Sequence, residues 1–310
     1  MTAATQTALL DSLAATGLPV DTIARRRWAD CCSLKAGLGH VVILTPRNAT
    51  ELTQSLSACR SIGVATAILG AGSNAVGSDD DDPAAIIIRL AKNGHFADIA
   101  PLGDGRYRVG AAALLGPALA ALARLGAGGF AGLSGIPGGI GGAAAMNAGA
   151  NGQDFGQAVV AMEGIDRRDG TPQVLPCRPD EWSYRHSPRP DWLIVTSVTL
   201  SLQPVNPAAE IALIHAERQR RQRVTPPGAS AGSVFLNPTP ELSAGKLIES
   251  AGCKGWSRGA FAVSEQHANW IVNASRQPGS AQDCQTLIDA VKKKVQAVHD
   301  LDLHTEWRFF

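Results

Sequence analysis

Blocks of hydrophobic and polar positions along the chain predict a mixture of helices and strands. Apolar runs at 41–44, 65–69 and 86–90 have the length of short buried strands, and 192–202 has that of a longer one. Further strands are expected at 107–109, on both sides of Asp169-Gly170, at 267–273 and at 303–310. Capped or amphipathic stretches predict helices over 5–17, 48–59, 115–125, 207–223, 242–251 and 280–299. Strands and helices alternate early and mix later, which indicates an α+β protein with more than one lobe.

Length, charge and cysteine usage narrow the class of protein. The 310 residues suffice for one large domain or two to three smaller ones. With 28 Lys+Arg against 27 Asp+Glu and no long basic run, we expect no nucleic-acid partner. Six scattered cysteines without CxxC or zinc spacing fit a reducing cytosol, and no metal site is expected. The N-terminus lacks the basic region of a secretory signal, and the uncharged stretch 125–146 is too rich in glycine and alanine to span a membrane. We therefore expect a cytoplasmic protein.

Two glycine-rich segments are the first candidate binding sites. A strand runs straight into 70-GAGSN-74, whose backbone N–H groups could form a nest for a phosphate, although a tight turn remains the alternative. The second segment, 132-GLSGIPGGIGGAAAMNAGANG-152, is harder to explain as a turn, because so many glycines disfavour folding. Close packing of chain on chain is its alternative interpretation. Two such loops suggest a ligand with two ends to hold, such as a dinucleotide.

Polar residues downstream are candidates for chemistry. Arg185, Ser233 and Glu306 stand out, the last of them in the expected terminal strand, but each alone is more often structural. The acidic run from Asp79 to Asp82 is expected to be a solvated turn. Helix 207–223 ends in a basic cluster, Arg218 to Arg223.

Six segments follow one another along the chain: ILGAGSN, the second glycine segment, YRHS, SAGSVFLNP, KLIESAGCKGWSRGAFAVSEQHANWIVN and the terminal LHTEWR. Taken in this order, they resemble the UDP-N-acetylenolpyruvoylglucosamine reductase family of flavoenzymes, over about residues 40 to 310. The resemblance implies a two-lobed FAD-binding fold of the vanillyl-alcohol oxidase/PCMH type plus a C-terminal α/β substrate lobe. It also implies FAD and NADPH as cofactors, and reduction of UDP-N-acetylglucosamine enolpyruvate to UDP-N-acetylmuramate for peptidoglycan precursors. The short spacing from Arg185 to Ser233 resembles the subtype without a tyrosine-bearing loop over the substrate.

The resemblance assigns roles by matching positions. Arg185 and Glu306 would lie near the enolpyruvyl carboxylate, and Ser233 would be the general acid. Tyr184 and Asn237 would line the substrate site, with Arg223 or Lys246 as candidate cations for the diphosphate. The residues that would hold FAD are Gly70, Ala71, Gly72, Ser73, Asn74, Gly135, Ile136, Pro137, Gly138, Gly141, Gly142, Asn147 and Gly149. Because neither glycine segment contains His or Cys, we expect non-covalent FAD.

The expected domains are a first FAD-binding lobe at 20–80, a second at 81–204, a substrate lobe at 205–300 and a terminal strand at 301–310. The oligomeric state is left open, with a monomer favoured. The chain departs from the family pattern at Leu236, which is usually Lys or Arg, at Leu38, and after YRHS, where 188-PRPDW-192 replaces a bulky apolar residue. A paralogous FAD-dependent oxidoreductase with another substrate is the alternative, and an idle flavin- or nucleotide-binding protein is a third hypothesis.

Overall fold

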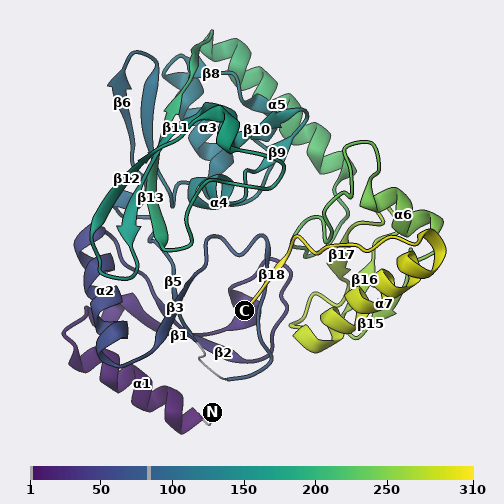
Figure 1. The fold of residues 1–310 in the computed structure, drawn as a ribbon, viewed down its shortest axis with the longest axis horizontal. Helices are drawn as coiled ribbons and strands as arrows, with labels where there is room; N and C mark the ends of the chain where they lie inside the picture. The colour runs from purple at the N-terminus through teal and green to yellow at the C-terminus, as the bar shows by residue number, and fades with distance from the viewer. Residues whose placement is uncertain (1–2, 82–84) are drawn as a thin grey trace.

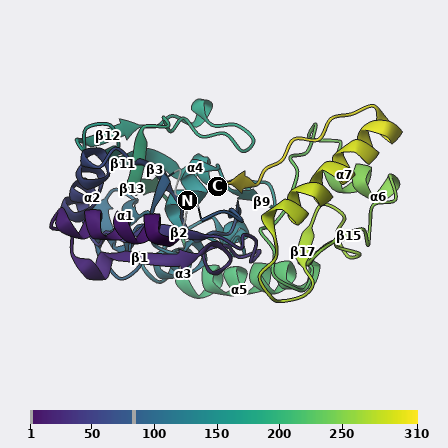
Figure 2. The ribbon, with the colours of Figure 1, turned by 90° about the horizontal axis from the view of Figure 1, so that it is seen from below.

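The computed structural model describes residues 3–81 and 85–310. The chain forms three lobes, with the third standing beside the other two (Figure 1). Figure 2 shows the same separation from below, with the last strand returning from the third lobe to the middle of the molecule. No helix in the described residues is long and apolar enough to cross a membrane.

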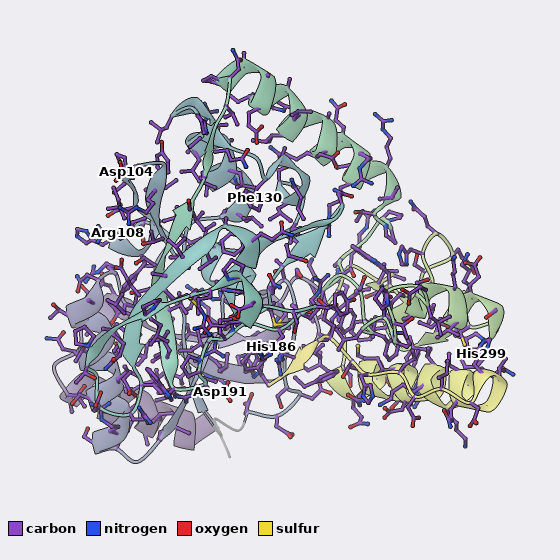
Figure 3. The ribbon with its side chains drawn as sticks, turned by 45° about the horizontal axis from the view of Figure 1, so that its top comes forward. Asp104, Arg108, Phe130, His186, Asp191 and His299 are labelled. Atoms are coloured by element: carbon purple, nitrogen blue, oxygen red, sulfur yellow. The ribbon has the colours of Figure 1, made fainter. Side chains whose placement is uncertain are left out.

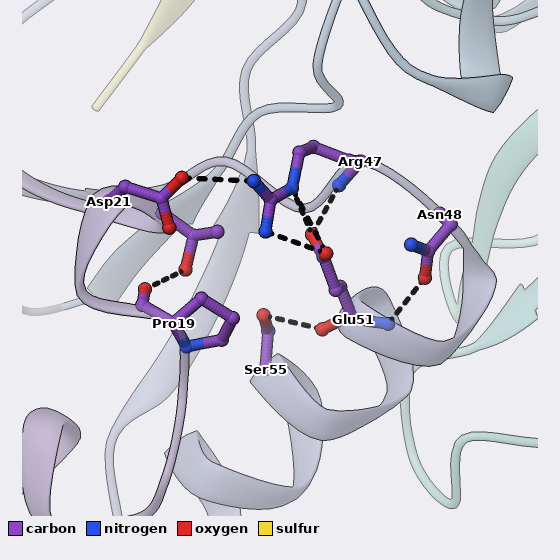
Figure 4. Close-up of polar contacts among 7 residues, drawn as sticks. Pro19, Asp21, Arg47, Asn48, Glu51 and Ser55 are labelled. Carbon is purple, nitrogen blue, oxygen red and sulfur yellow. Dashed lines mark hydrogen bonds and ion pairs between the residues drawn. The ribbon is translucent and has the colours of Figure 1, made fainter.

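The first lobe is built on a four-stranded sheet with the order β1-β2-β5-β3. Its elements are α1 (Ala3–Ala15), β1 (Ile23–Arg27), β2 (His40–Leu44), α2 (Ala49–Ser61), β3 (Ala65–Ile68) and β5 (Ala85–Ile88). Asn48 caps α2 as expected, its side chain accepting from the backbone N–H of Glu51, while Arg47 pairs with the Glu51 carboxylate at 2.9 Å (Figure 4). Because β5 belongs to this sheet, the first lobe extends past the boundary expected at 80.

The second lobe contains a five-stranded antiparallel sheet with the order β12-β11-β13-β7-β6. Its strands are β6 (Ile99–Gly103), β7 (Arg106–Gly110), β11 (Val159–Asp166), β12 (Pro172–Pro176) and β13 (Leu193–Ser201). Two small pairs accompany it: β8 (Ala127–Gly128) with β14 (Gln203–Pro204), and β9 (Gly149–Ala150) with β10 (Gln153–Asp154). Helices α3 (Leu115–Arg124), α4 (Ile140–Ala145) and α5 (Pro207–Val224) complete it. Buried Ile214 places α5 in the core of this lobe and not in the substrate lobe, where the boundary at 205 had assigned it.

The third lobe packs two helices on a three-stranded sheet. Its elements are α6 (Ala244–Ser250), β15 (Ser257–Arg258), β16 (Phe261–Val263), β17 (Ile271–Asn273) and α7 (Ala281–His299). Short 3-10 turns lie at Val20–Thr22, Trp28–Asp30, His95–Ala97, Ala131–Leu133, Phe155–Ala158 and Pro179–Glu181. The strand expected over 267–273 covers only Ile271–Asn273. The first half of that range forms a turn instead, closed by a hydrogen bond from the Trp270 N–H to the His267 carbonyl.

Two expectations are wrong, one about the terminal strand and one about the acidic run that begins at Asp79. Only Arg308–Phe309 forms the terminal strand β18, which pairs in parallel with β4 (Ala75–Val76), so Glu306 lies before it. Asp79 does not lie in a solvated turn: its carboxylate accepts hydrogen bonds from the backbone of Leu38, from the Ser280 hydroxyl and from the first turn of α7. Asp82, in the same acidic run, lies outside the described residues.

Candidate functional site

A cavity of about 1640 Å³ lies where the lobes meet. Its lining comes from the first glycine loop, the second glycine segment, helix α5, the Ser233 segment and the chain's last residues. Pockets for single small ligands are roughly 300–1,000 Å³. The volume therefore gives room for a large cofactor and a substrate together.

The first glycine loop, Gly70 to Asn74, combines an open surface with tight packing. A Cβ at Gly70 would meet no atom within 4 Å, whereas one at Gly72 would lie 2.0 Å from the Cys31 carbonyl oxygen. Gly70 thus leaves space in the cavity for a ligand, and Gly72 is required by its backbone neighbour and by its φ of +73°. The Asn74 amide donates to the Glu306 carbonyl at 3.1 Å, so this side chain holds protein backbone.

The second glycine segment divides in the same way. Cβ atoms at Gly139 and Gly141 would come within 2.9 and 2.8 Å of Ala111, whereas Gly142 faces open cavity. Close packing of chain on chain therefore accounts for Gly139 and Gly141, whereas Gly142 leaves room for a ligand. Part of it is the helix α4 and not a loop, because the apolar face of that helix, including Ile140, is buried in the second lobe.

Three further residues expected to hold FAD have contacts within the protein. Ser73 donates to the Pro137 carbonyl at 3.1 Å and joins the two glycine segments. Buried Asn147 donates to the Ser183 carbonyl at 2.8 Å and accepts from the Gly156 N–H at 2.9 Å. Ala71, Gly135, Ile136, Gly138 and Gly149 line the cavity, as do Ser73 and Pro137, but Asn147 does not.

Arg185 and Glu306 form an ion pair at the cavity, with 2.9 Å between Nε and Oε1. Both side chains are mostly buried, at 21% and 15% exposure. Burial raises the pKa of the Glu306 carboxyl, and the charge and hydrogen bond of Arg185 oppose that rise. Arg185 adopts a left-handed backbone conformation, with φ of 54°, which directs its guanidinium toward the carbonyls of Asn147 and Gly149 at 3.5 Å.

Ser233 lies in the cavity lining between two fixed neighbours. Its backbone forms an isolated bridge with Trp270, and the next carbonyl, of Val234, accepts from the Glu306 N–H at 2.8 Å. The Ser233 hydroxyl makes no hydrogen bond to any residue that the structure describes. It is therefore available to a ligand and lies on the chain segment that is bonded to Glu306.

The remaining expected substrate residues do not line the cavity. Tyr184 is half exposed, stacks under the Arg185 guanidinium at 5.0 Å, and its hydroxyl accepts from the Asn237 N–H at 3.4 Å. The Asn237 side chain accepts from the Ala244 N–H at 3.1 Å, just at the start of α6. Arg223 and Lys246 are exposed and absent from the lining.

The cavity's cations come instead from neighbours of those residues. Arg221, half-buried on α5, lies against Gly135 and has no ion pair within residues 3–81 and 85–310. Burial lowers its pKa, and repulsion from Arg185 and Arg220 adds to the effect. Arg189 also lines the cavity and donates to the Leu193 carbonyl at 3.0 Å. Its segment can be found in Figure 3 between the labelled residues His186 and Asp191. The sequence analysis noted only that 188-PRPDW-192 lacks the bulky apolar residue of the family. The arginine at position 189 was the signal for a cation in the cavity.

The residues present fit FAD. Open space over Gly70 and Gly142 would admit a pyrophosphate or ribityl chain against backbone. The apolar side chains of Leu69, Ile87 and Phe310 line the same cavity and suit a flat aromatic ring.

Comparisons with known proteins agree with this geometry. Residues 41–175 match the family described as FAD binding domain, and residues 222–310 the one described as UDP-N-acetylenolpyruvoylglucosamine reductase, C-terminal domain. A UDP-N-acetylenolpyruvoylglucosamine reductase from Rhodopseudomonas palustris (strain BisB5) is 36% identical over 85% of this chain and 83% of its own. One from Moorella thermoacetica (strain ATCC 39073 / JCM 9320) is 34% identical over 94% of both.

Among solved structures, the UDP-N-acetylenolpyruvylglucosamine reductase from Thermus caldophilus superposes with a TM-score of 0.76. It is 32% identical over 93% of this chain and 98% of that one. The expected fold, an α+β FAD-binding region followed by a substrate lobe, is confirmed by these matches. On this evidence the chain belongs to the UDP-N-acetylenolpyruvoylglucosamine reductase family.

Proposed function

We propose that the protein is an FAD-dependent reductase that converts UDP-N-acetylglucosamine enolpyruvate to UDP-N-acetylmuramate with NADPH, in peptidoglycan precursor synthesis. The observation that carries the proposal is the meeting of Arg185, Ser233 and Glu306 at one cavity with both glycine segments. These three residues come from distant parts of the chain and meet at one cavity. The reaction would take place in the cytoplasm.

The residue types suit the chemistry. FAD held by the two glycine segments would, once reduced, supply the hydride that the β-carbon of the enol ether requires. Negative charge then develops on the substrate carboxylate, and the planar guanidinium of Arg185 can bind it with two hydrogen bonds. Glu306 holds Arg185 through Nε at 2.9 Å, and the two Nη groups make only long contacts of 3.5 Å to the carbonyls of Asn147 and Gly149, which a substrate carboxylate could replace.

Ser233 completes the reaction by donating its hydroxyl proton to the α-carbon. A serine is a weak acid in water, but it can protonate a carbanion-like carbon when held within hydrogen-bond reach. Since no described residue competes for its hydroxyl, the proton can point toward the ligand. Solvent returns the proton to the serine oxygen before the next turnover.

Leu236 bears on the alternative of a paralogue with another substrate. Its backbone N–H donates to the His304 carbonyl at 2.9 Å, and the residue does not line the cavity. Arg185, Arg218 and Arg221 do line it. The leucine therefore leaves the cavity with cations enough for a UDP-sugar, and this favours the common substrate.

The proposal is tested with purified, FAD-loaded protein and two half-reactions. NADPH should bleach the flavin, and UDP-N-acetylglucosamine enolpyruvate should restore its absorbance. Ser233→Ala should keep the bleaching rate and slow the restoration by about 10²–10⁴, the usual contribution of a general acid. Ser233→Cys should recover part of the loss. A wild-type flavin that this substrate does not reoxidise would favour the paralogue, and unchanged reoxidation in Ser233→Ala would remove the serine from the mechanism.

A further inference from the structure

The segment from Ser33 to Gly39 has no part in the chemistry above, yet it joins two lobes. Leu34 and Ala36 are fully buried in the core of the third lobe, together with Trp307. The backbone of the segment also pairs with the residue that precedes the cap of α7: Gly279 donates to the Lys35 carbonyl at 2.9 Å. The segment is thus a clasp, in which chain from the first lobe forms part of the third.

Ser33 stands at the start of this clasp and contacts both binding segments. Its backbone N–H donates to the Gly72 carbonyl at 2.9 Å, and its hydroxyl lies 2.8 Å from the Ser230 carbonyl and 3.2 Å from that of Gly72. A hydroxyl has one proton to donate, so the shorter contact, to Ser230, is favoured. Ser33 therefore bonds the first glycine loop through its backbone and the Ser233 segment through its side chain.

The near end of the Ser233 segment is organised around Ser230. The Ser230 hydroxyl accepts from the Gly232 N–H at 3.2 Å and lies 3.0 Å from the Ile271 carbonyl. Gly232 has a φ of +83°, and Ser233 follows it directly. The place of Ser230 thus sets the direction in which the backbone enters Ser233.

The glycine loop at the other end of this connection packs closely against the backbone of Cys31. Because a Cβ at Gly72 would meet the Cys31 carbonyl oxygen at 2.0 Å, backbone lies against backbone there. A ligand that orders the loop will therefore order Cys31 to Ser33, and through the Ser33 hydroxyl it will order Ser230.

We propose that Ser33 is a positioning residue that ties the Ser233 segment to the first glycine loop, so that filling the flavin site also places the proton donor. The role given to Ser233 rests on the proposed function. Ser33 is not in the cavity lining and acts through Ser230. Proton transfer depends steeply on distance and direction, so a small loosening at Ser230 should be felt in that step.

The first test is hydrogen exchange on the full chain with and without FAD. In the wild type, FAD should slow amide exchange both at 70–74 and at 230–234. In Ser33→Ala the protection at 70–74 should remain and that at 230–234 should be lost. Ser33→Thr should keep both, since Ser33 is exposed and a methyl group has room. Ser61→Ala, which removes only a local bond to the Ala58 carbonyl, is the matched control.

The second test uses the two half-reactions. Bleaching by NADPH should be unchanged in Ser33→Ala, and reoxidation by the UDP substrate should slow about three- to tenfold, the effect of one neutral hydrogen bond. Ser33→Cys, a weaker donor of similar size, should give a similar loss and serves if the alanine variant does not fold. Equal protection of 230–234 in wild type and Ser33→Ala, or loss of protection at both segments, overturns the proposal. If the wild type fails on the UDP substrate, the proposed function falls, and the exchange experiment still decides the role of Ser33.

Discussion

Glu306 is the residue whose ionisation the site controls, since burial raises the pKa of its carboxyl and Arg185 only partly offsets this. A raised pKa means that the folded protein holds this proton more tightly than the unfolded chain does. The corresponding stability is complete below the unfolded pKa and is lost as pH rises through the folded pKa. The Glu306→Gln variant has no titrating carboxyl at this position, so it does not lose this stability as pH rises. We therefore expect the melting temperature of Glu306→Gln, relative to wild type, to rise between about pH 4 and pH 8.

Calorimetry of ligand-free protein at several pH values measures this difference. Glu249→Gln is the control, because the Glu249 carboxylate pairs with Lys254 at an exposed position. A difference between Glu306→Gln and wild type that stays flat across the range, or that falls with pH, would mean that Arg185 dominates burial.

At the scale of the element, α5 shows how one helix separates two arginines. Arg218 and Arg221 are three residues apart and share a face, whereas Arg223 is about 200° of helical rotation from Arg221. Arg221 lies in the cavity with no ion pair in the described chain, and Arg223 is exposed. Only the first should matter to an anionic ligand.

We expect Arg221→Gln to lower kcat/KM by at least tenfold at saturating FAD, as for a lost charged hydrogen bond, and Arg223→Gln by less than twofold. Ligand-free Arg221→Gln should melt at a higher temperature than wild type, because repulsion from Arg185 and the burial of an unpaired charge are both relieved. Steady-state kinetics and thermal unfolding measure the two effects. Equal kinetic losses in the two variants would show that α5 contributes only general positive charge.

The helices and long strands were predictable because their own sequences carry the signal. Periodicity and the Asn48 cap placed α2, and Asp169-Gly170 placed the β11–β12 hairpin. The terminal strand was overestimated because Thr305 and Glu306 bond to a different segment from Arg308, a tertiary choice that an apolar pattern does not encode. Arg185, Ser233 and Glu306 were candidates from resemblance, whereas the place of Arg221 in the cavity depends on the orientation of α5.

At the scale of the whole molecule, the lobes are joined by contacts that sequence patterns do not reveal, and Asp79 is the clearest. One carboxylate oxygen accepts from the N–H groups of Leu38 at 3.0 Å and Ala281 at 2.8 Å. The other accepts from the Ser280 hydroxyl at 2.6 Å and the Gln282 N–H at 3.0 Å. A residue of the first lobe thus satisfies the first turn of α7, and its negative charge suits that end of the helix.

Burial alone would raise the pKa of Asp79, but these four hydrogen bonds outweigh it and lower the pKa. A lowered pKa gives stability that is present above the unfolded pKa and is lost as pH falls through the folded one. Asp79→Asn keeps only one accepting oxygen, so its free energy of unfolding at neutral pH should be about 2–4 kcal/mol lower than that of wild type. This gap should close in acid. Amide hydrogen exchange in the first turn of α7 should become faster, because the contact between the first and third lobes is weakened.

Asp80→Asn, whose exposed carboxylate accepts no hydrogen bond in the described residues, is the matched control. A gap that persists unchanged at low pH would place the loss in packing and not in the carboxylate's charge.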